Sequence, residues 1–214
     1  MYPASNPPVI GHDFDCRVFN APTTTERIDA IGGGVLRGVL DPRVCELSSA
    51  YLRLKADIGE MCLGDGQLAM SYSSYADLLM EVLLDQMRRP AEELLDVSLL
   101  PTHSYTRLYR HRDELTPHTD RPACEVVVSL TLGYAADAVW PLHVRGSGTT
   151  FECLLEPGDC VVYAGSQHEH WRTRFDGQWQ AQTTLHYVRS DGPFADWAFD
   201  KRPALGRHVG TRRT

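Results

Sequence analysis

The pattern of apolar residues changes at about residue 100. Before that point, two stretches repeat apolar residues every three or four positions, which is the spacing of one helix face. After it, short segments rich in Val, Leu, Thr and Tyr are separated by Gly, Pro and Asp, as is typical of strands and turns. The pattern predicts helices followed by a mainly antiparallel set of strands.

The first predicted helix follows a short strand at residues 35–40. Asp41 is suited to cap this helix, Pro42 suits its first position, and Gly59 can end it. The apolar side chains form a single stripe, which we expect to face the core. The stripe consists of Val44, Leu47, Tyr51, Leu54 and Ile58.

The second predicted helix begins after Ser74, with Asp77 three residues on completing a weak capping box. Pro90 is expected to break or restart it. Met87 can lie beside the apolar stripe of this helix, and packing in the core is enough to explain its presence there. The apolar stripe of this helix consists of Leu78, Leu79, Val82 and Leu83.

Seven strands are predicted in the second half, at residues 103–110, 125–132, 140–145, 150–155, 160–164, 169–174 and 180–188. Helices followed by strands in this order predict an α+β fold, in which N-terminal helices support an antiparallel double-sheet barrel of jelly-roll type. A length of 214 residues suits one compact domain. We expect residues 1–34 to be an N-terminal extension and residues 35–214 to be the single domain.

Charge and composition narrow the class of partner. The net charge is −7 and basic residues are scattered until a short tail, so nucleic acid is not expected. The sequence contains no apolar run of membrane-spanning length and its start lacks a signal-peptide pattern, so we expect a cytoplasmic protein without a membrane partner. The six cysteines lie far apart, which favours buried free thiols over disulfides or a zinc cluster.

The segment around His118 carries the strongest chemical signal. His118 and Asp120 are two residues apart, so on extended chain both side chains point to the same side and can reach one ion. A third ligand can come from a later strand, where His168 and His170 share the same parity. Two imidazoles and one carboxylate on an octahedral ion leave three positions open, as non-haem iron(II) oxygenases require. The alternative is a strand histidine bonded to Asp120.

From about residue 35 to residue 200 the chain resembles the iron(II)/2-oxoglutarate-dependent dioxygenases of the prolyl-hydroxylase type, within them a bacterial group of mostly unassigned substrate. The matching stretches are 99–109, 118–125, 140–141, 157–159, 170–172 and 185–187. The resemblance implies a double-stranded β-helix, the cofactor Fe(II), the co-substrates 2-oxoglutarate and O₂, and release of succinate and CO₂. It also places the third ligand immediately before Trp171, which selects His170 over His168.

The anchor for the distal carboxylate of 2-oxoglutarate departs from the family pattern. Many relatives have Arg or Lys about ten residues after the second histidine, where this chain has Gln180. Strand alternation puts Arg172 on the same face as His170, so Arg172 is the expected anchor; the alternative is an outward-facing Arg172 in a salt bridge. The hydroxyl groups expected to assist are those of Tyr109, Ser129 and Thr131, and the arginines that could meet an acidic substrate are Arg107 and Arg121.

We therefore expect an oxygenase that hydroxylates an unactivated C–H bond of a small metabolite or amino acid. The alternatives are a peptide or protein side-chain hydroxylase and a non-catalytic metal-binding jelly-roll module. His186 is expected to line the pocket. The remaining histidines are expected to be structural or exposed, namely His12, His103, His111, His143 and His208.

Overall fold

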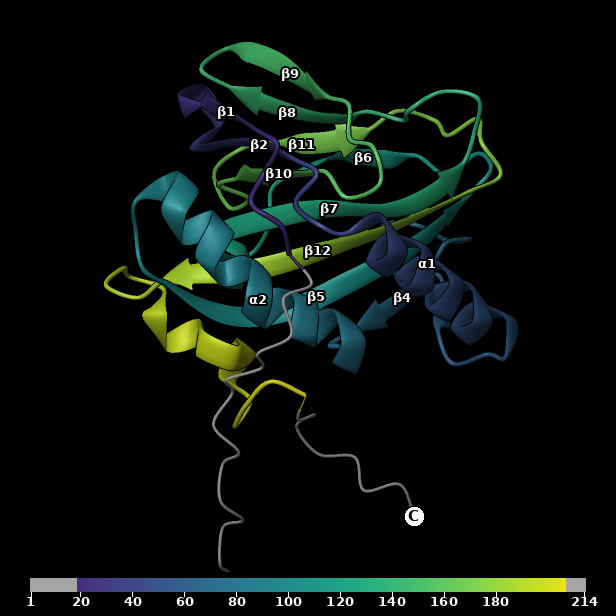
Figure 1. Ribbon diagram of the computed structural model, residues 1–214, viewed down its shortest axis with the longest axis horizontal. Helices are drawn as coiled ribbons and strands as arrows, with labels where there is room; N and C mark the ends of the chain where they lie inside the picture. The colour runs from purple at the N-terminus through teal and green to yellow at the C-terminus, as the bar shows by residue number, and fades with distance from the viewer. Residues whose placement is uncertain (1–18, 207–214) are drawn as a thin grey trace, which may run out of the picture.

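The computed structural model describes residues 19–206, which form two antiparallel sheets and two α-helices (Figure 1). The larger sheet has the strand order β1 (Thr24–Ile28), β2 (Gly33–Arg37), β10 (Cys160–Tyr163), β7 (Val126–Ala135), β12 (Trp179–Arg189), β5 (Leu99–Arg110), β4 (Tyr72–Tyr75), β3 (Cys62–Leu63). The smaller sheet has the order β6 (Leu115–His118), β11 (His170–Arg172), β8 (Leu142–Gly146), β9 (Thr149–Cys153). Short 3₁₀ helices are η1 (Asp29–Ile31), η2 (Pro122–Cys124) and η3 (Ala195–Lys201).

The predicted α+β jelly roll is confirmed. Helices α1 (Pro42–Asp57) and α2 (Leu78–Leu95) lie on one face of the larger sheet, and the smaller sheet lies on the other (Figure 1). All seven strands predicted after residue 100 are present within a few residues of the expected bounds. The sequence analysis did not predict the short strands β1, β3, β4 and β6, because runs of two to five residues carry little periodic signal.

Alternation along the central strands separates a helix-facing surface from an interior surface. Leu130 of β7 and Leu185 of β12 belong to the apolar cluster that packs against the helices. Their sequence neighbours Ser129 and His186 instead line a cavity between the two sheets. The strand period therefore sends polar side chains inward at this end of the barrel, where they are available for chemistry.

Helix α1 begins and ends as predicted, but its predicted core face is wrong. The Asp41 carboxylate caps the helix by accepting the N–H of Arg43 at 2.8 Å. Leu47 and Leu54 are 68% and 60% exposed, whereas the buried side consists mainly of small residues, namely Cys45, Ser48, Ser49, Leu52 and Ala56. Small side chains let the helix approach the sheet closely: a Cβ placed on Gly133 of β7 would lie 3.1 Å from the Ser49 Cβ.

Helix α2 differs from the prediction at its cap, its stripe and its proline. Asp77, not Ser74, is the cap, and it accepts the N–H groups of Leu79 and Met80 at 3.0 and 3.3 Å. The helix continues through Pro90, because its buried residues on both sides of the proline remain packed against the sheet. Leu78 is 65% exposed and the buried stripe is Met80, Leu83, Leu84, Met87, Ala91 and Leu94, with Met87 in the core as expected.

Residues 24–34, which the sequence analysis assigned to the extension, form β1, η1 and the start of β2 and belong to the larger sheet. Residues 1–18 and 207–214, including His12 and His208, lie outside the described residues. Among residues 19–206, neither helix is apolar enough over a sufficient length to cross a membrane. All five cysteines in this range are free; Cys62 is exposed and the other four are buried, namely Cys45, Cys124, Cys153 and Cys160.

Candidate active site

The fold brings His118, Asp120 and His170 together at one edge of the smaller sheet. His118 ends β6 and lies directly opposite His170, the first residue of β11. Asp120 follows two residues after His118, and its backbone N–H donates to the carbonyl of Gly165 at 2.9 Å. The Asp120 carboxylate oxygens lie 3.7 Å from His118 Nε2 and 3.6 Å from His170 Nε2. One ligand atom from each residue lies within 4.8 Å of the other two, which is close enough for a shared ion.

Backbone carbonyls orient both imidazoles toward this point. His118 Nδ1 lies 2.8 Å from the carbonyl of Thr116, and His170 Nδ1 lies 3.0 Å from the carbonyl of His168. A carbonyl can only accept, so each Nδ1 carries the proton and each Nε2 keeps a lone pair. Burial lowers the pKa of both histidines, that of His170 to about 4, so both are neutral ligands.

Asp120 completes a donor set that fits Fe(II). Burial raises the pKa of its carboxyl group to about 6, because the nearby charges do not compensate the desolvation of the anion. A bound dication would supply that compensation. Two neutral imidazoles and one carboxylate match the facial triad of non-haem iron sites, and the described residues place no thiol in this set.

His168, the rival ligand in the sequence analysis, lies outside the triad. His168 lies in the bend that precedes β11, and its Nδ1 is 3.0 Å from the carbonyl of Arg145. Although His168 and His170 have the same parity in sequence, only His170 lies in the strand. The sequence could not separate them because the alternation rule holds only within a continuous strand.

The triad opens onto a cavity of about 400 Å³ between the sheets, which is also lined by Arg172, Tyr109 and Ser129. Arg172 is 2% exposed and points inward, so the outward alternative is excluded. Its NH1 donates to the carbonyl of Trp140, while its NH2 is buried without a hydrogen-bond partner among residues 19–206. Burial lowers the pKa of this guanidinium, as expected for a cation without a counter-ion.

One expected carboxylate contact, that of Thr131, differs from the prediction. Thr131 does not line the cavity; its hydroxyl donates to Gln182 Oε1 at 3.0 Å. The side-chain amide of Gln182 in turn donates to the Ser129 hydroxyl at 2.9 Å. Gln180, which stands where many relatives have a basic residue, donates to the same Gln182 oxygen at 3.0 Å. The threonine therefore positions other groups of the cavity wall.

The two alternative arginines are both paired with acids. Arg107 lines the cavity and contacts Asp65 at 2.8 Å, whereas Arg121 makes two contacts to Asp200 at 2.7 and 2.8 Å. Arg172 is thus the cavity arginine that has no carboxylate partner among residues 19–206.

Three residues of the cavity wall were not predicted from the sequence to line it, namely His103, Cys124 and Tyr163. His103, expected to be structural, lines the cavity beside His186, which lies there as expected; Cys124 lines it as well. Tyr163 packs its ring edge against His170, with ring centroids 4.9 Å apart. Strand alternation could have found His103. It lies six positions before Tyr109 on β5, and residues an even number of positions apart on a strand face the same side. No sequence signal brings Cys124 to the same place, because η2 is not a strand.

A comparison with protein-family models and with curated proteins found no match. Solved structures do match. A prolyl-4-hydroxylase from Pseudomonas putida is 16% identical, with a TM-score of 0.63 over 75% of this chain and 94% of that chain. The α-ketoglutarate-dependent epimerase SnoN from nogalamycin biosynthesis is 18% identical, with a TM-score of 0.64 over 84% and 88%.

HygX from Streptomyces hygroscopicus, solved with nickel, 2-oxoglutarate and hygromycin B bound, is 13% identical, with a TM-score of 0.58 over 76% of this chain and 85% of that chain. At these identities the similarity establishes a shared fold. It confirms the double-stranded β-helix expected from the resemblance in sequence.

Proposed function

We propose that this protein is an iron(II)- and 2-oxoglutarate-dependent oxygenase. One observation carries the proposal: two imidazoles and a carboxylate open onto the same cavity as a buried arginine that has no counter-ion among the described residues. The first feature suits a metal that must keep positions open for exchangeable ligands. The second suits a carboxylate, because an unpaired buried charge costs several kcal/mol. Together they match a metal-chelating diacid.

His118, Asp120 and His170 hold the iron in this proposal. The carbonyls of Thr116 and His168 fix the two imidazoles in the tautomer that binds metal, so these backbone groups are part of the site. When bound, iron and 2-oxoglutarate supply the oxidation of a substrate C–H bond by O₂, with release of succinate and CO₂. The protein residues bind, orient and shield the reacting groups.

Arg172 binds the distal carboxylate of 2-oxoglutarate. Its guanidinium lies 4.8 Å from the centroid of the Trp140 ring and 5.9 Å from that of the Tyr109 ring, and these aromatic faces stabilise the cation without neutralising it. The free NH2 can therefore donate to a carboxylate. Tyr109 and Ser129 line the same cavity and can add hydroxyl groups, while Thr131 acts through Gln182.

The substrate is a small molecule in this proposal. A cavity of about 400 Å³ falls in the usual range for such ligands, roughly 300–1,000 Å³. The structurally similar HygX was solved with hygromycin B bound, and SnoN with a nogalamycin compound. These ligands belong to those proteins, and they support a small-molecule role for the shared architecture. Hydroxylation of a metabolite or amino acid is the reaction we infer.

Anaerobic addition of Fe(II) and then 2-oxoglutarate tests the proposal. We expect a visible metal-to-ligand absorption band that requires both components and that Asp120→Ala abolishes. Incubation with a metabolite extract under ¹⁸O₂ should then give a substrate-specific product detected by mass spectrometry. A folded protein that binds Fe(II) but shows neither the band nor consumption of 2-oxoglutarate would contradict the proposal and favour a non-catalytic metal-binding module.

A further inference from the structure

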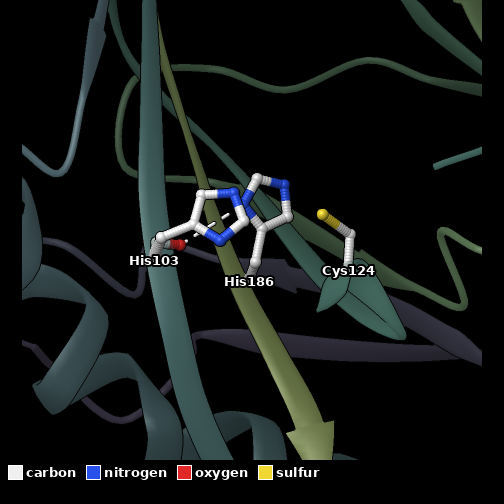
Figure 2. Close-up of side chains that lie close together, drawn as sticks. All are labelled: His103, Cys124 and His186. Atoms are coloured by element: carbon white, nitrogen blue, oxygen red, sulfur yellow. Dashed lines mark hydrogen bonds between the residues drawn. The ribbon is translucent and has the colours of Figure 1, made fainter. Parts of the chain in front are cut away.

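A second cluster of metal-binding residue types lies on the wall of the same cavity. His103 of β5 and His186 of β12 are cross-strand partners, and Cys124 ends η2 beside them. Figure 2 shows the two imidazoles stacked, with the Cys124 sulfur directed toward His186. The ring centroids are 4.4 Å apart, and one ligand atom from each residue lies within 4.8 Å of the other two. The cluster contains none of the three residues of the proposed iron site.

Both imidazoles of this cluster are held in the tautomer that leaves Nε2 free. His186 Nδ1 lies 3.3 Å from the carbonyl of His103, to which it must donate. His103 Nδ1 lies 3.2 Å from the Thr102 hydroxyl and 3.9 Å from Asp200. The Thr102 hydroxyl donates its own proton to a backbone carbonyl, that of Ala123 or His186, so it accepts from His103. In this cluster, as in the iron triad, an oxygen atom accepts the Nδ1 proton of each histidine and so fixes the tautomer.

Burial keeps the three side chains uncharged. They are 4% to 6% exposed, and burial lowers the pKa of His103 to about 3 and that of His186 well below its usual value. Neutral imidazoles are the form that ligates a metal. Burial raises the pKa of the Cys124 thiol, so a metal ion would have to displace its proton on binding.

Two cations act on His103: Arg121, beside its Nε2, and Arg202, which is paired with Glu81. Arg121 NH2 lies 3.5 Å from His103 Nε2, which is at the limit of a hydrogen bond. The guanidinium is already paired with both carboxylate oxygens of Asp200, and its side chain is 43% exposed. Its charge is therefore largely compensated and its side chain has room to move away. The position of His103 Nε2 next to a donor also shows that this nitrogen carries a lone pair.

We propose that His103, Cys124 and His186 form a second metal site, which binds Zn²⁺ and leaves its fourth position open to the cavity. Two imidazoles with a carboxylate suit Fe(II), whereas two imidazoles with a thiolate suit Zn²⁺ or copper. Copper sites of this type add a weak axial ligand such as Met, and none of the described residues that line the cavity is a Met, so we assign Zn²⁺. Because all three residues line the cavity, the fourth ligand is water or a substrate heteroatom. The two metals would thus share one cavity, with oxidation at one site and substrate binding at the other.

Cobalt(II) distinguishes the two sites, because a thiolate ligand gives a near-ultraviolet charge-transfer band and the His118 set contains no thiolate. The experiment uses the full chain with Cys16 and Cys62 changed to Ser, which removes an exposed thiol and one outside the described residues. We expect Co²⁺ to produce the band and Zn²⁺ to bleach it. Cys124→Ser and His186→Gln should each abolish the band. Cys45→Ser, which removes a buried thiol on α1, should leave it intact.

The iron site serves as the internal control. His118→Ala should retain the thiolate band and lose the Fe(II)/2-oxoglutarate band, whereas Cys124→Ser should show the reverse. Absence of the thiolate band in the protein with intact Cys124 would overturn the second site and leave the proposed oxygenase untouched. A band that survives His186→Gln but disappears in His118→Ala would also overturn it, because Cys124 would then be a ligand of the first metal. If Cys124→Ser does not fold by circular dichroism, His186→Gln decides.

Discussion

At the scale of single side chains, three arginines determine the charge that the cavity presents beside the metal-binding triad. Arg172 is buried, charged and without an acid partner among residues 19–206, whereas Arg107 and Arg121 are neutralised by Asp65 and Asp200. Among residues 19–206, Arg172 is therefore the cavity arginine whose charge is free to meet an incoming ligand. This difference in pairing, more than the position of any arginine in sequence, selects the carboxylate anchor.

The first prediction concerns the iron ligands. His118→Ala, Asp120→Ala and His170→Ala should each lose most of the iron affinity and all coupled turnover, because each removes one of three protein ligands. His168→Ala is the matched control and should keep both, since the substitution removes a side chain that bonds to the carbonyl of Arg145 and keeps the backbone carbonyl that orients His170. Metal content and 2-oxoglutarate consumption measure the outcome. Loss of iron in His168→Ala with retention in His170→Ala would show the assignment to be wrong.

The second prediction concerns the anchor. Arg172→Gln should raise the apparent KM for 2-oxoglutarate roughly tenfold to several hundredfold, as expected for loss of a charge-assisted pair of about 1.5–3 kcal/mol. Iron affinity should change little, because Arg172 is not a ligand. Steady-state kinetics with varied 2-oxoglutarate provides the test. An unchanged KM in the folded variant rules out the assignment and makes Arg121, Arg107 and His186 the next candidates.

At the scale of secondary-structure elements, packing distance decides which face of a helix is buried. The apolar stripe of α1 predicted from periodicity is largely exposed, and the helix packs through Leu52 and small residues such as Ser48 and Ser49. The close approach of Ser49 to Gly133 of β7 leaves no room for a larger side chain at that point of contact. Dispersion contacts over a short distance therefore outweigh the burial of a few leucines.

A pair of substitutions on α1 tests this reversal. Leu52 is fully buried, so Leu52→Ala should lower the free energy of unfolding by about 2–5 kcal/mol. Leu54 is 60% exposed, so Leu54→Ala should change it by less than about 0.5 kcal/mol. Urea denaturation of both variants measures the difference. Equal effects would mean that the helix buries the face that periodicity predicted.

A half-buried carboxylate, that of Asp65, joins the loop before β4 to β5. Asp65 accepts the backbone N–H groups of Gln67 and Leu68, and it contacts Tyr105 and Arg107 on β5. Burial of Asp65 opposes its ionisation, but Arg107 and the hydrogen bonds outweigh burial and lower its pKa. The loop and the strand both line the cavity, so this contact shapes the opening.

A pH dependence of stability follows from this lowered pKa. The ionised Asp65 stabilises the fold at any pH above the ordinary carboxyl pKa of about 3.9, and this contribution is lost as the pH falls through the lower pKa of the folded state. Asp65→Asn should therefore be less stable than wild type at pH 7, and the difference should shrink below pH 4. Urea denaturation at several pH values tests this, with the exposed Asp137→Asn as control. A difference that stays constant with pH would contradict it.

At the scale of the whole molecule, two sheets enclose a polar cavity while the helices seal the opposite face of the larger sheet (Figure 1). The enclosed volume of about 400 Å³ limits what can reach the metal site. A compact metabolite can enter whole, whereas a folded protein could insert only a side chain. Access to the cavity is therefore a property of the assembled barrel and not of any one strand.

The last prediction concerns substrate size. Consumption of 2-oxoglutarate should accelerate on addition of one specific metabolite or a small related set, because the cavity encloses ligands of that size. Fractionated metabolite extracts and a library of unfolded peptides should be compared under the same conditions. Broad stimulation by the peptides, with none by the metabolites, would instead support a peptide or protein side-chain hydroxylase.

Seven of the strands after residue 100 could be predicted from the sequence, and so could the proximity of His118 and Asp120. Period-two alternation and a two-residue spacing are local properties, so neighbouring residues are sufficient to specify them. The N-terminal cap of α1 at Asp41 and the inward direction of Arg172 followed from similar short-range rules. Resemblance to a family, in turn, favoured His170 over His168.

Only the tertiary structure decided the features that depend on contacts between distant segments. Which face of α1 is buried depends on its distance from β7, which no helical period encodes. The pairing of Arg107 and Arg121 with acids, and the meeting of Cys124 with His103 and His186, join residues that are 21 or more positions apart. Such contacts form when the sheets close, because burial then forces each polar group to find a partner.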